Sequence, residues 1–253
     1  MKFAFPRLLS ALLMAALLTA APVARAQDDQ PLTPKQQDAV KKLVHDYLME
    51  NPGIIADAIE ALRQKEDLAA EAAAKKTLAE RKDEVFNDAD SPVLGNAKGD
   101  VTLVEFFDYR CPYCKAMADQ IADVVKADGK TKLVMKEFAV LGPESVAAAK
   151  AALASREQKK YEEFHRALMR LKEPLTEKTL MKTASEVGIN TDKLRKDMDD
   201  PKIDTILKNN LKLAHDLNVD ATPTFVIGDQ IVTGAIPAQN LKQLIDQARK
   251  SKS

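Results

Sequence analysis

The stretch VTLVEFFDYRCPYC, residues 101–114, contains both cysteines of the 253-residue chain. Its first seven residues are mostly apolar, and a short run of this kind indicates a buried strand. Pro112 suits the first position of a helix, which places Cys111 and Cys114 on the first helical turn. Because no third cysteine exists, the pair either carries out redox chemistry or forms half of a metal site completed from elsewhere.

The position of the two cysteines predicts different roles for them. Unpaired backbone N–H groups and the helix dipole favour negative charge at a helix start, so Cys111 is expected to be the exposed thiolate that attacks and leaves. Cys114 lies one turn further in and is expected to be the shielded, resolving thiol. An inert structural disulfide is the alternative, but a bridge that closes so small a loop restricts the unfolded chain little.

Residues 1–26 match a cleavable export signal. Lys2 and Arg7 precede an apolar segment at 8–21, and Ala24-Arg25-Ala26 fits the small-residue cleavage pattern, so that the mature chain begins at Gln27. The apolar segment is shorter than the ~20 residues of a membrane-spanning helix, which is the alternative interpretation. Export to a bacterial periplasm is therefore expected, a compartment in which disulfides persist.

Composition excludes some classes of function. The signal holds three of the 38 basic residues and none of the 38 acidic ones, so the mature chain has a net side-chain charge of about −3. No basic stripe or aromatic platform for a nucleic acid is present. The mature chain is long enough to bury a core, and it does so without a structural disulfide.

Residues 27–90 predict a helical region distinct from the rest. Thr33-Pro34 is a helix start, Asn51-Pro52-Gly53 stops this first helix, and a longer second helix is expected from about 54 to 86. The apolar positions with helical spacing are Val40, Leu43, Val44, Tyr47 and Leu48 in the first helix, and Ile55, Ile59, Leu62, Ala69, Ala73 and Leu78 in the second.

This apolar stripe is too sparse to fold alone, which leaves two interpretations. The near-heptad spacing favours pairing with other copies of the chain, and the alternative is a solvated helix that leans on the main domain. We expect residues 27–90 to be an oligomerisation region.

The catalytic domain is predicted at residues 91–250, after a linker at 88–100 rich in Asp, Ser, Pro, Asn and Gly. The order of elements is strand, helix, strand, long helical insert, hairpin and helix. The expected ranges are 101–107, 111–127, 132–140, about 142–217 for the insert (helical from 145), 224–227 with 231–233, and 237–250. Thr176 and Asn190 are expected to cap helices within the insert.

Two motifs resemble one known family. Residues 105–114 (EFFDYRCPYC) are similar to the active-site strand and turn of DsbA-like thioredoxin-fold proteins, and residues 221–225 (ATPTF) are similar to their cis-proline loop. The helical insert between the motifs also resembles theirs. Residues 51–59 (NPGIIADAI) are similar to the N-terminal region of ScsC-type proteins, which are linked to suppression of copper sensitivity and include oligomeric disulfide isomerases. The resemblance implies an α/β thioredoxin fold with an inserted helical domain, preceded by the helical oligomerisation region.

The resemblance assigns roles to three further residues. Pro223 matches the cis-proline that faces the cysteines and pairs with an extended substrate. Thr222 before it is more similar to the isomerases than to the strongest oxidases. Glu105 matches a buried acid that assists proton transfer at the resolving cysteine; within Val-Glu-Phe-Phe, its carboxyl is independently expected to be half-buried with a raised pKa. A strand end that reaches solvent is the alternative for Glu105.

Pro112 and Tyr113 are expected to tune the redox potential, because the residues between the cysteines change hydrogen bonding and charge around Cys111. The Pro-His of very oxidising relatives is absent, so a milder potential is expected and the role of primary oxidase is less favoured.

His45, His165 and His215 are scattered, and we interpret them as surface or core residues. They form no convincing zinc set with the two cysteines. Copper(I) is soft and accepts two thiolates, so reduced Cys111 and Cys114 are a possible copper(I) site, and copper binding is the second predicted function. A purely structural oligomerising adaptor is a third possibility, in which the cysteine motif would be idle.

The sequence thus predicts a periplasmic thiol–disulfide oxidoreductase, with a disulfide isomerase favoured over an oxidase. No cofactor beyond the Cys111–Cys114 pair is expected. The predicted partners are secreted proteins with cysteines, a membrane redox partner that resets the pair, and other copies of the chain in a trimer or dimer.

Overall fold

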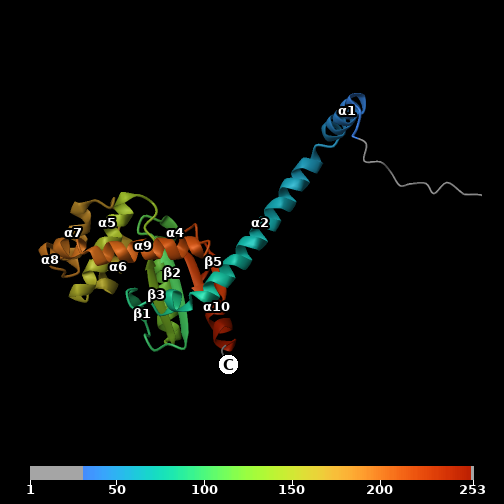
Figure 1. Cartoon of the computed structure of the whole chain (residues 1–253). Helices are drawn as coiled ribbons and strands as arrows, with labels where there is room; N and C mark the ends of the chain where they lie inside the picture. The colour runs from blue at the N-terminus through green and yellow to red at the C-terminus, as the bar shows by residue number, and fades with distance from the viewer. Residues whose placement is uncertain (1–30, 252–253) are drawn as a thin grey trace, which may run out of the picture. The chain divides into compact units, whose positions relative to one another are not determined.

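The structure is a computed structural model that describes residues 31–251 (Figure 1). The predicted export signal at residues 1–26 lies outside the described residues. No helix within 31–251 is long and apolar enough to cross a membrane. The chain divides into two compact units, Met1–Ile59 and Glu60–Ser253, and the division falls inside helix α2 (Gly53–Glu80).

In the first unit, helix α1 (Pro34–Glu50) begins and ends where the sequence predicts. The Thr33 hydroxyl accepts a hydrogen bond from the Gln36 backbone N–H, and the Gln36 side chain accepts one from the Thr33 N–H in return, which is a capping box. The backbone leaves the helix at Asn51, and α2 starts two residues later.

No residue of α1 is buried in this chain. Its apolar stripe is open to solvent instead, with Leu43 68 % exposed and Tyr47 56 % exposed. Val40, Val44, Ile55 and Ile59 are also large exposed apolar residues of this unit. The unit therefore presents apolar surface that it does not itself cover.

The single second helix expected at 54–86 is wrong, because the chain breaks at Arg81 into α2 and a short helix α3 (Lys82–Phe86). The Arg81 guanidinium forms ion pairs with Glu84 and with Asp216, which is distant in sequence. A contact so distant in sequence cannot be recognised in a helical pattern. The chain after α3 is then fixed by Lys136, which is 1 % exposed and donates to the Glu84 carbonyl at 2.8 Å and to Asp88 at 2.7 Å.

A five-stranded mixed sheet forms the centre of the second unit (Figure 1). The strand order is β1-β3-β2-β4-β5; β2 and β3 are parallel, and the other neighbours are antiparallel. The strands are β1 (Val93–Gly95), β2 (Val101–Phe107), β3 (Thr131–Glu137), β4 (Thr224–Ile227) and β5 (Gln230–Thr233). The prediction of a linker at 88–100 missed β1, which pairs with β3 as an edge strand. Three residues are too few to show an alternating pattern.

Alternate residues of β2 pack on opposite faces of the sheet, as the period of a strand requires. Leu103 and Phe107 belong to the larger core cluster, together with residues of α4 (Pro112–Asp128) and α10 (Ala238–Lys250). Val104 and Phe106 belong to the second cluster, with residues of α9 (Pro201–Asp216), α3 and the end of α2. Both faces of the central strand are therefore covered.

The predicted helical insert contains α5 (Pro143–Ala154), a short 3-10 helix η1 (Ser155–Gln158), α6 (Tyr161–Arg170), α7 (Glu177–Glu186), α8 (Thr191–Met198) and α9. Thr176 and Asn190 cap α7 and α8 with their side chains, as predicted. The last helix, α9, returns the chain to the sheet, where Leu213 packs in the second cluster.

Two leucines of α2 test how its last turns are held. Leu78 is 1 % exposed, so Leu78→Ala is expected to lower the free energy of unfolding by about 2–5 kcal/mol through the cavity it leaves. Leu68, 68 % exposed, is the matched control. Leu68→Ala is expected to change the free energy of unfolding by less than about 0.5 kcal/mol. Chemical denaturation measures both. Equal effects would show that α2 is not anchored in the core.

Candidate active site

The sheet register brings the two sequence motifs together. Strand β2 ends where antiparallel β4 begins, with Phe106 opposite Thr224. The cysteine motif follows β2 by a few residues, and Thr222-Pro223 directly precedes β4. The two motifs therefore meet at one end of the sheet although 111 residues separate Cys111 from Thr222.

Cys111 is the N-cap residue of α4, with the extended backbone that this position requires. Its Sγ accepts a hydrogen bond from the Cys114 backbone N–H at 3.4 Å. The same Sγ donates to the Thr222 carbonyl at 3.2 Å. The peptide bond between Thr222 and Pro223 is cis, as the resemblance implied. The sulfur is thus in contact with both motifs.

The expectation that Cys111 is exposed is wrong for this structure. Cys111 is 3 % exposed and Cys114 is fully buried, whereas Tyr113 between them is 66 % exposed. The loop at Thr222 lies against the Cys111 sulfur, and this long-range cover cannot be inferred from a position at a helix start. Both cysteines are free thiols.

The two thiols differ in their surroundings, and burial raises the pKa of Cys114 well above its usual range. A hydrogen bond with the Asp108 backbone opposes this effect, and the nearby Glu105 adds to it. Cys114 therefore stays protonated unless a base takes its proton.

Glu105 lies on β2 opposite Met135 of β3 and is 3 % exposed. Burial alone raises the pKa of its carboxyl to about 8, because no described residue donates a hydrogen bond or a positive charge to it. The sequence predicted a half-buried carboxyl with a raised pKa; the raised pKa is confirmed, and the burial is more complete than predicted. A carboxyl with a pKa near neutrality can exchange a proton under physiological conditions.

Asp108 was not predicted as a site residue, although it lies three residues before Cys111. It is 1 % exposed, and its carboxylate accepts four hydrogen bonds. The donors are the backbone N–H groups of Arg110 (2.7 Å), Val140 (2.9 Å) and Leu141 (3.0 Å), and the Ser145 hydroxyl (2.7 Å). Asp108 thereby ties the cysteine loop to the start of the insert. An acid between Phe107 and Tyr109 was the only signal in the sequence.

A second buried network was also not predicted. Glu137 accepts hydrogen bonds from the Tyr109 hydroxyl at 3.1 Å and the Tyr161 hydroxyl at 2.8 Å. The Tyr109 oxygen lies 3.0 Å from Nδ1 of His165. Burial raises the pKa of Glu137 and lowers the pKa of His165 to about 3, so His165 is neutral. These residues come from β3, α6 and the cysteine loop, and only the fold brings them together.

The histidines lie as interpreted from the sequence. His165 is a core residue, while the side chains of His45 and His215 are 72 % and 88 % exposed. The described residues contain no cluster of three or more His, Cys, Asp or Glu side chains that could hold a metal ion. Copper(I) at this site would therefore be coordinated by the two sulfurs of Cys111 and Cys114.

Comparison with known families agrees with this geometry. A profile described as "Thioredoxin" matches residues 87–247, which is more than half of the chain. The chain belongs to the thioredoxin family. A second profile, described as "Copper resistance protein ScsC N-terminal domain", matches residues 36–68.

Three solved structures are similar to this chain. A thioredoxin-like oxidoreductase from Silicibacter pomeroyi is 43 % identical, with a TM-score of 0.65, over 66 % of this chain and 97 % of the other. A linker-deletion variant of Proteus mirabilis ScsC is 28 % identical, with a TM-score of 0.67, over 89 % and 100 %. The thiol-disulfide exchange protein α-DsbA2 from Wolbachia pipientis is 31 % identical, with a TM-score of 0.66, over 71 % and 97 %.

The family, the fold and the neighbours together identify a DsbA-like thiol–disulfide oxidoreductase of the ScsC type. The match to ScsC extends over the N-terminal helices as well as the thioredoxin domain.

The buried Glu105 carboxyl makes stability depend on pH. Its pKa is about 8 in the folded state and near the ordinary 4.5 in the unfolded chain. Between these values only the folded state holds the proton. Stability is therefore full below pH 4.5 and is lost as pH rises through 8, by on the order of 5 kcal/mol. Glu105→Gln cannot ionise and is expected to remove this loss.

Thermal unfolding of both proteins from pH 5 to pH 9 measures the effect. The control is Glu157→Gln, which removes an exposed carboxyl and should leave the pH profile unchanged. Parallel profiles for the parent and Glu105→Gln would mean that Glu105 ionises freely in the folded protein.

Proposed function

We propose that the protein is a periplasmic disulfide isomerase that acts through the Cys111-Pro112-Tyr113-Cys114 motif. The observation that carries the proposal is the Cys111 sulfur, which caps α4 and contacts the Thr222 carbonyl before Pro223. A nucleophile placed against this backbone segment can meet an extended client chain along the same loop. The export pattern of residues 1–26 supports the periplasmic location.

The proposed reaction follows from the different surroundings of the Cys111 and Cys114 sulfurs. The Cys111 thiolate attacks a client disulfide, and one client sulfur leaves as a thiolate while a mixed disulfide forms. In an isomerisation, that client thiolate attacks a different client disulfide and frees another client thiolate. The freed thiolate then attacks the client sulfur of the mixed disulfide, which forms a new client disulfide and releases Cys111 as a thiolate. If the client stalls, Cys114 gives its proton to Glu105 and attacks Cys111, which releases the reduced client. Pro112 and the exposed Tyr113 flank the attacking sulfur and are proposed to set its potential.

The isomerase proposal also rests on the first unit. Its apolar stripe is exposed along α1, and the matching ScsC N-terminal profile covers residues 36–68. We propose that this stripe pairs with other copies of the chain in a trimer or a dimer. Several active sites would then act on one misfolded client, which suits repeated isomerisation better than a single oxidation.

The proposed clients are secreted proteins with cysteines, and an isomerase requires a membrane partner that keeps the pair reduced. Thiol trapping of fresh cells measures this state directly. A reduced Cys111/Cys114 pair supports the isomerase, whereas an oxidised pair would support an oxidase of the same fold.

The two cysteines are expected to respond differently to substitution. Cys111→Ser should abolish exchange, because the attacking sulfur is lost. Cys114→Ser should accumulate mixed disulfides with client proteins, because the resolving thiol is lost. Non-reducing gels after acid trapping distinguish the two. The control is Ser155→Ala, which removes a buried hydroxyl from the insert. Mixed disulfides that accumulate in Cys111→Ser and not in Cys114→Ser would reverse the assignment.

Charged substitutions in the exposed apolar stripe of α1 test the assembly of the full mature chain. Leu43→Glu with Tyr47→Glu is expected to give a monomer, because both side chains are more than half exposed and become buried only between copies. The monomer should still reduce insulin but should lose most of its ability to reactivate scrambled ribonuclease. Light scattering and the two assays measure these outcomes.

The control for this test is Lys42→Gln, which changes the charge on the opposite face of α1 and should leave assembly intact. A monomeric parent protein would contradict the proposed oligomer. A monomeric variant that isomerises as well as its parent would separate assembly from function.

A further inference from the structure

A cavity of about 830 Å³ lies between the cysteine helix α4 and the insert. Pro112, Lys115 and Ala116 line it from α4, and the end of α6 with the chain that follows lines it from the insert. None of the described residues that line it belongs to the Thr222-Pro223 loop, so the cavity is separate from the contact between the two motifs. Its volume is within the range of ligand sites in proteins.

The cavity has an apolar floor and a charged rim. Tyr109, Met169 and Leu175 form the floor and are 1 %, 3 % and 7 % exposed. The charged residues that line the cavity are Arg110, Lys115, Glu144, Arg170, Lys172 and Glu173. A ligand site typically combines an apolar lining with a small number of polar groups of this kind.

Most of the charged rim residues already have a partner of opposite charge. The pairs are Arg110 with Glu144 at 3.0 Å, Arg170 with Asp119 at 2.7 Å, and Glu173 with Lys182 at 3.8 Å. Among the described residues, Lys115 and Lys172 form no such pair. The charge that is left over at the rim is therefore positive.

Lys115 is a half-buried cation without a counter-charge. Its Nζ donates to the Leu171 carbonyl at 2.5 Å, and no described carboxylate pairs with it. Leu171 is the C-cap of α6, so the negative end of the helix dipole offsets only part of the charge. Burial lowers the pKa of the Lys115 ammonium group from its ordinary value. Buried charges in proteins are normally paired, and an anionic group in the cavity would supply the partner that this chain does not.

Lys172 is the second cation of the rim without a described acidic partner. It follows Leu171 directly, is exposed, and lines the same cavity. A lysine side chain is a flexible stem with a compact charge at its end. The Lys172 ammonium group can therefore reach a carboxylate that is bound at Lys115.

Lys115 lies one helical turn from the attacking sulfur. Its backbone N–H donates to the Cys111 carbonyl at 3.1 Å, and residues four apart share one side of a helix, with about 5–6 Å between their Cβ atoms. An extended client chain advances about 3.3 Å per residue, and every second side chain points to the same face. A client side chain two residues from the reactive cysteine therefore reaches about as far as Lys115 lies from Cys111.

We propose that the cavity binds an acidic side chain of the client, two residues from the cysteine that Cys111 attacks, through the ammonium groups of Lys115 and Lys172. The inference rests on the proposed function and adds to it a preference among clients. A bound carboxylate holds the client disulfide beside Cys111, so client cysteines with this acidic neighbour are attacked faster. Both lysines bind the client and take no part in the exchange of sulfur atoms.

Two peptides that differ only in charge test the proposal. Each has one cysteine activated as a 2-pyridyl disulfide, and the positions two residues before and after it are Glu in one peptide and Gln in the other. The full mature chain with Cys114→Ser serves as the parent, because it stops at the mixed disulfide. The Cys111 thiolate forms a bond to the peptide sulfur, the bond to the pyridyl sulfur breaks, and pyridine-2-thiolate leaves with the bonding electrons. Its absorbance gives the rate.

The Glu peptide is expected to react about tenfold faster than the Gln peptide, because hydrogen bonds between charged partners are stronger than neutral ones. The ratio of the two rates should approach one in Lys115→Met, which keeps the length of the side chain and removes the charge. It should fall furthest in Lys172→Glu, which places a like charge beside the client carboxylate. In the parent, the ratio should also fall at about 1 M salt, where charges are screened within about 3 Å.

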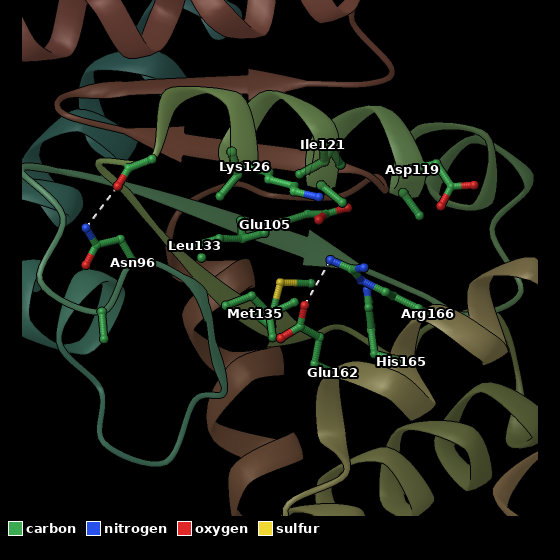
Figure 2. A pocket seen from close by; sticks show the side chains of 17 residues that line it. Asn96, Glu105, Asp119, Ile121, Lys126, Leu133, Met135, Glu162, His165 and Arg166 are labelled. Atoms are coloured by element: carbon green, nitrogen blue, oxygen red, sulfur yellow. Dashed lines mark hydrogen bonds and ion pairs between the residues drawn. The ribbon is translucent and has the colours of Figure 1, made fainter. Parts of the chain in front are cut away.

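The control is Lys126→Glu, which changes the charge of the domain by the same amount. Lys126 is an exposed lysine of α4 that lines a different pocket, beside Glu105 (Figure 2). This variant should keep the ratio of the parent. An equal fall in Lys126→Glu and Lys172→Glu would assign the preference to net charge and would overturn the site.

Equal rates for the two peptides in the parent would also overturn the proposal, as would a ratio that survives both Lys115→Met and Lys172→Glu. Each ratio is measured within one variant, so a general loss of stability affects both peptides alike. Failure of both peptides to react with Cys111 would contradict the proposed function instead, because that reaction requires only the attacking sulfur.

Discussion

The position of β2 between parallel β3 and antiparallel β4 is the constraint on which the site depends. Antiparallel pairing brings the end of β2 next to the start of β4, so the residues that follow one strand meet those that precede the other. Cys111 and Thr222 are in contact for this reason alone. The helical insert can therefore occupy most of the chain between the motifs without disturbing their contact.

Three carboxyl groups are buried within a few residues of this junction, and they differ in their hydrogen-bond partners. Asp108 accepts four hydrogen bonds, which satisfy its charge and fasten the insert to the cysteine loop. Glu137 accepts two from tyrosines. Glu105 has no described partner, and a carboxyl buried in this way is held near neutrality by desolvation. A buried carboxyl without a hydrogen-bond partner stabilises a fold less than an apolar side chain would, so its place near Cys114 supports the proton exchange proposed for it.

The sequence predicted those parts of the fold that local signals determine. The cysteine helix, the caps at Thr176 and Asn190, and the burial of Glu105 each follow from residues within one or two turns. The break at Arg81 and the edge strand β1 were missed because both depend on partners distant in sequence, Asp216 and β3. The burial of Cys111 was missed for the same reason, since the covering loop lies 111 residues away. The cavity and the position of His165 depend on how α6 packs, which no periodicity encodes.

Helix α1 raises a different physical question, because none of its residues is buried within its own unit. Most helical stability in proteins comes from packing of an apolar face, since nucleation of an isolated helix is costly and each propagation step gains little. Its capping box and its ion pair between Lys42 and Asp46, at 2.6 Å, contribute only small amounts. A stable α1 therefore requires apolar contacts that its own unit does not supply. The stripe through Leu43 and Tyr47 is the surface on which such contacts can form, so assembly and the folding of this helix are expected to be one and the same event.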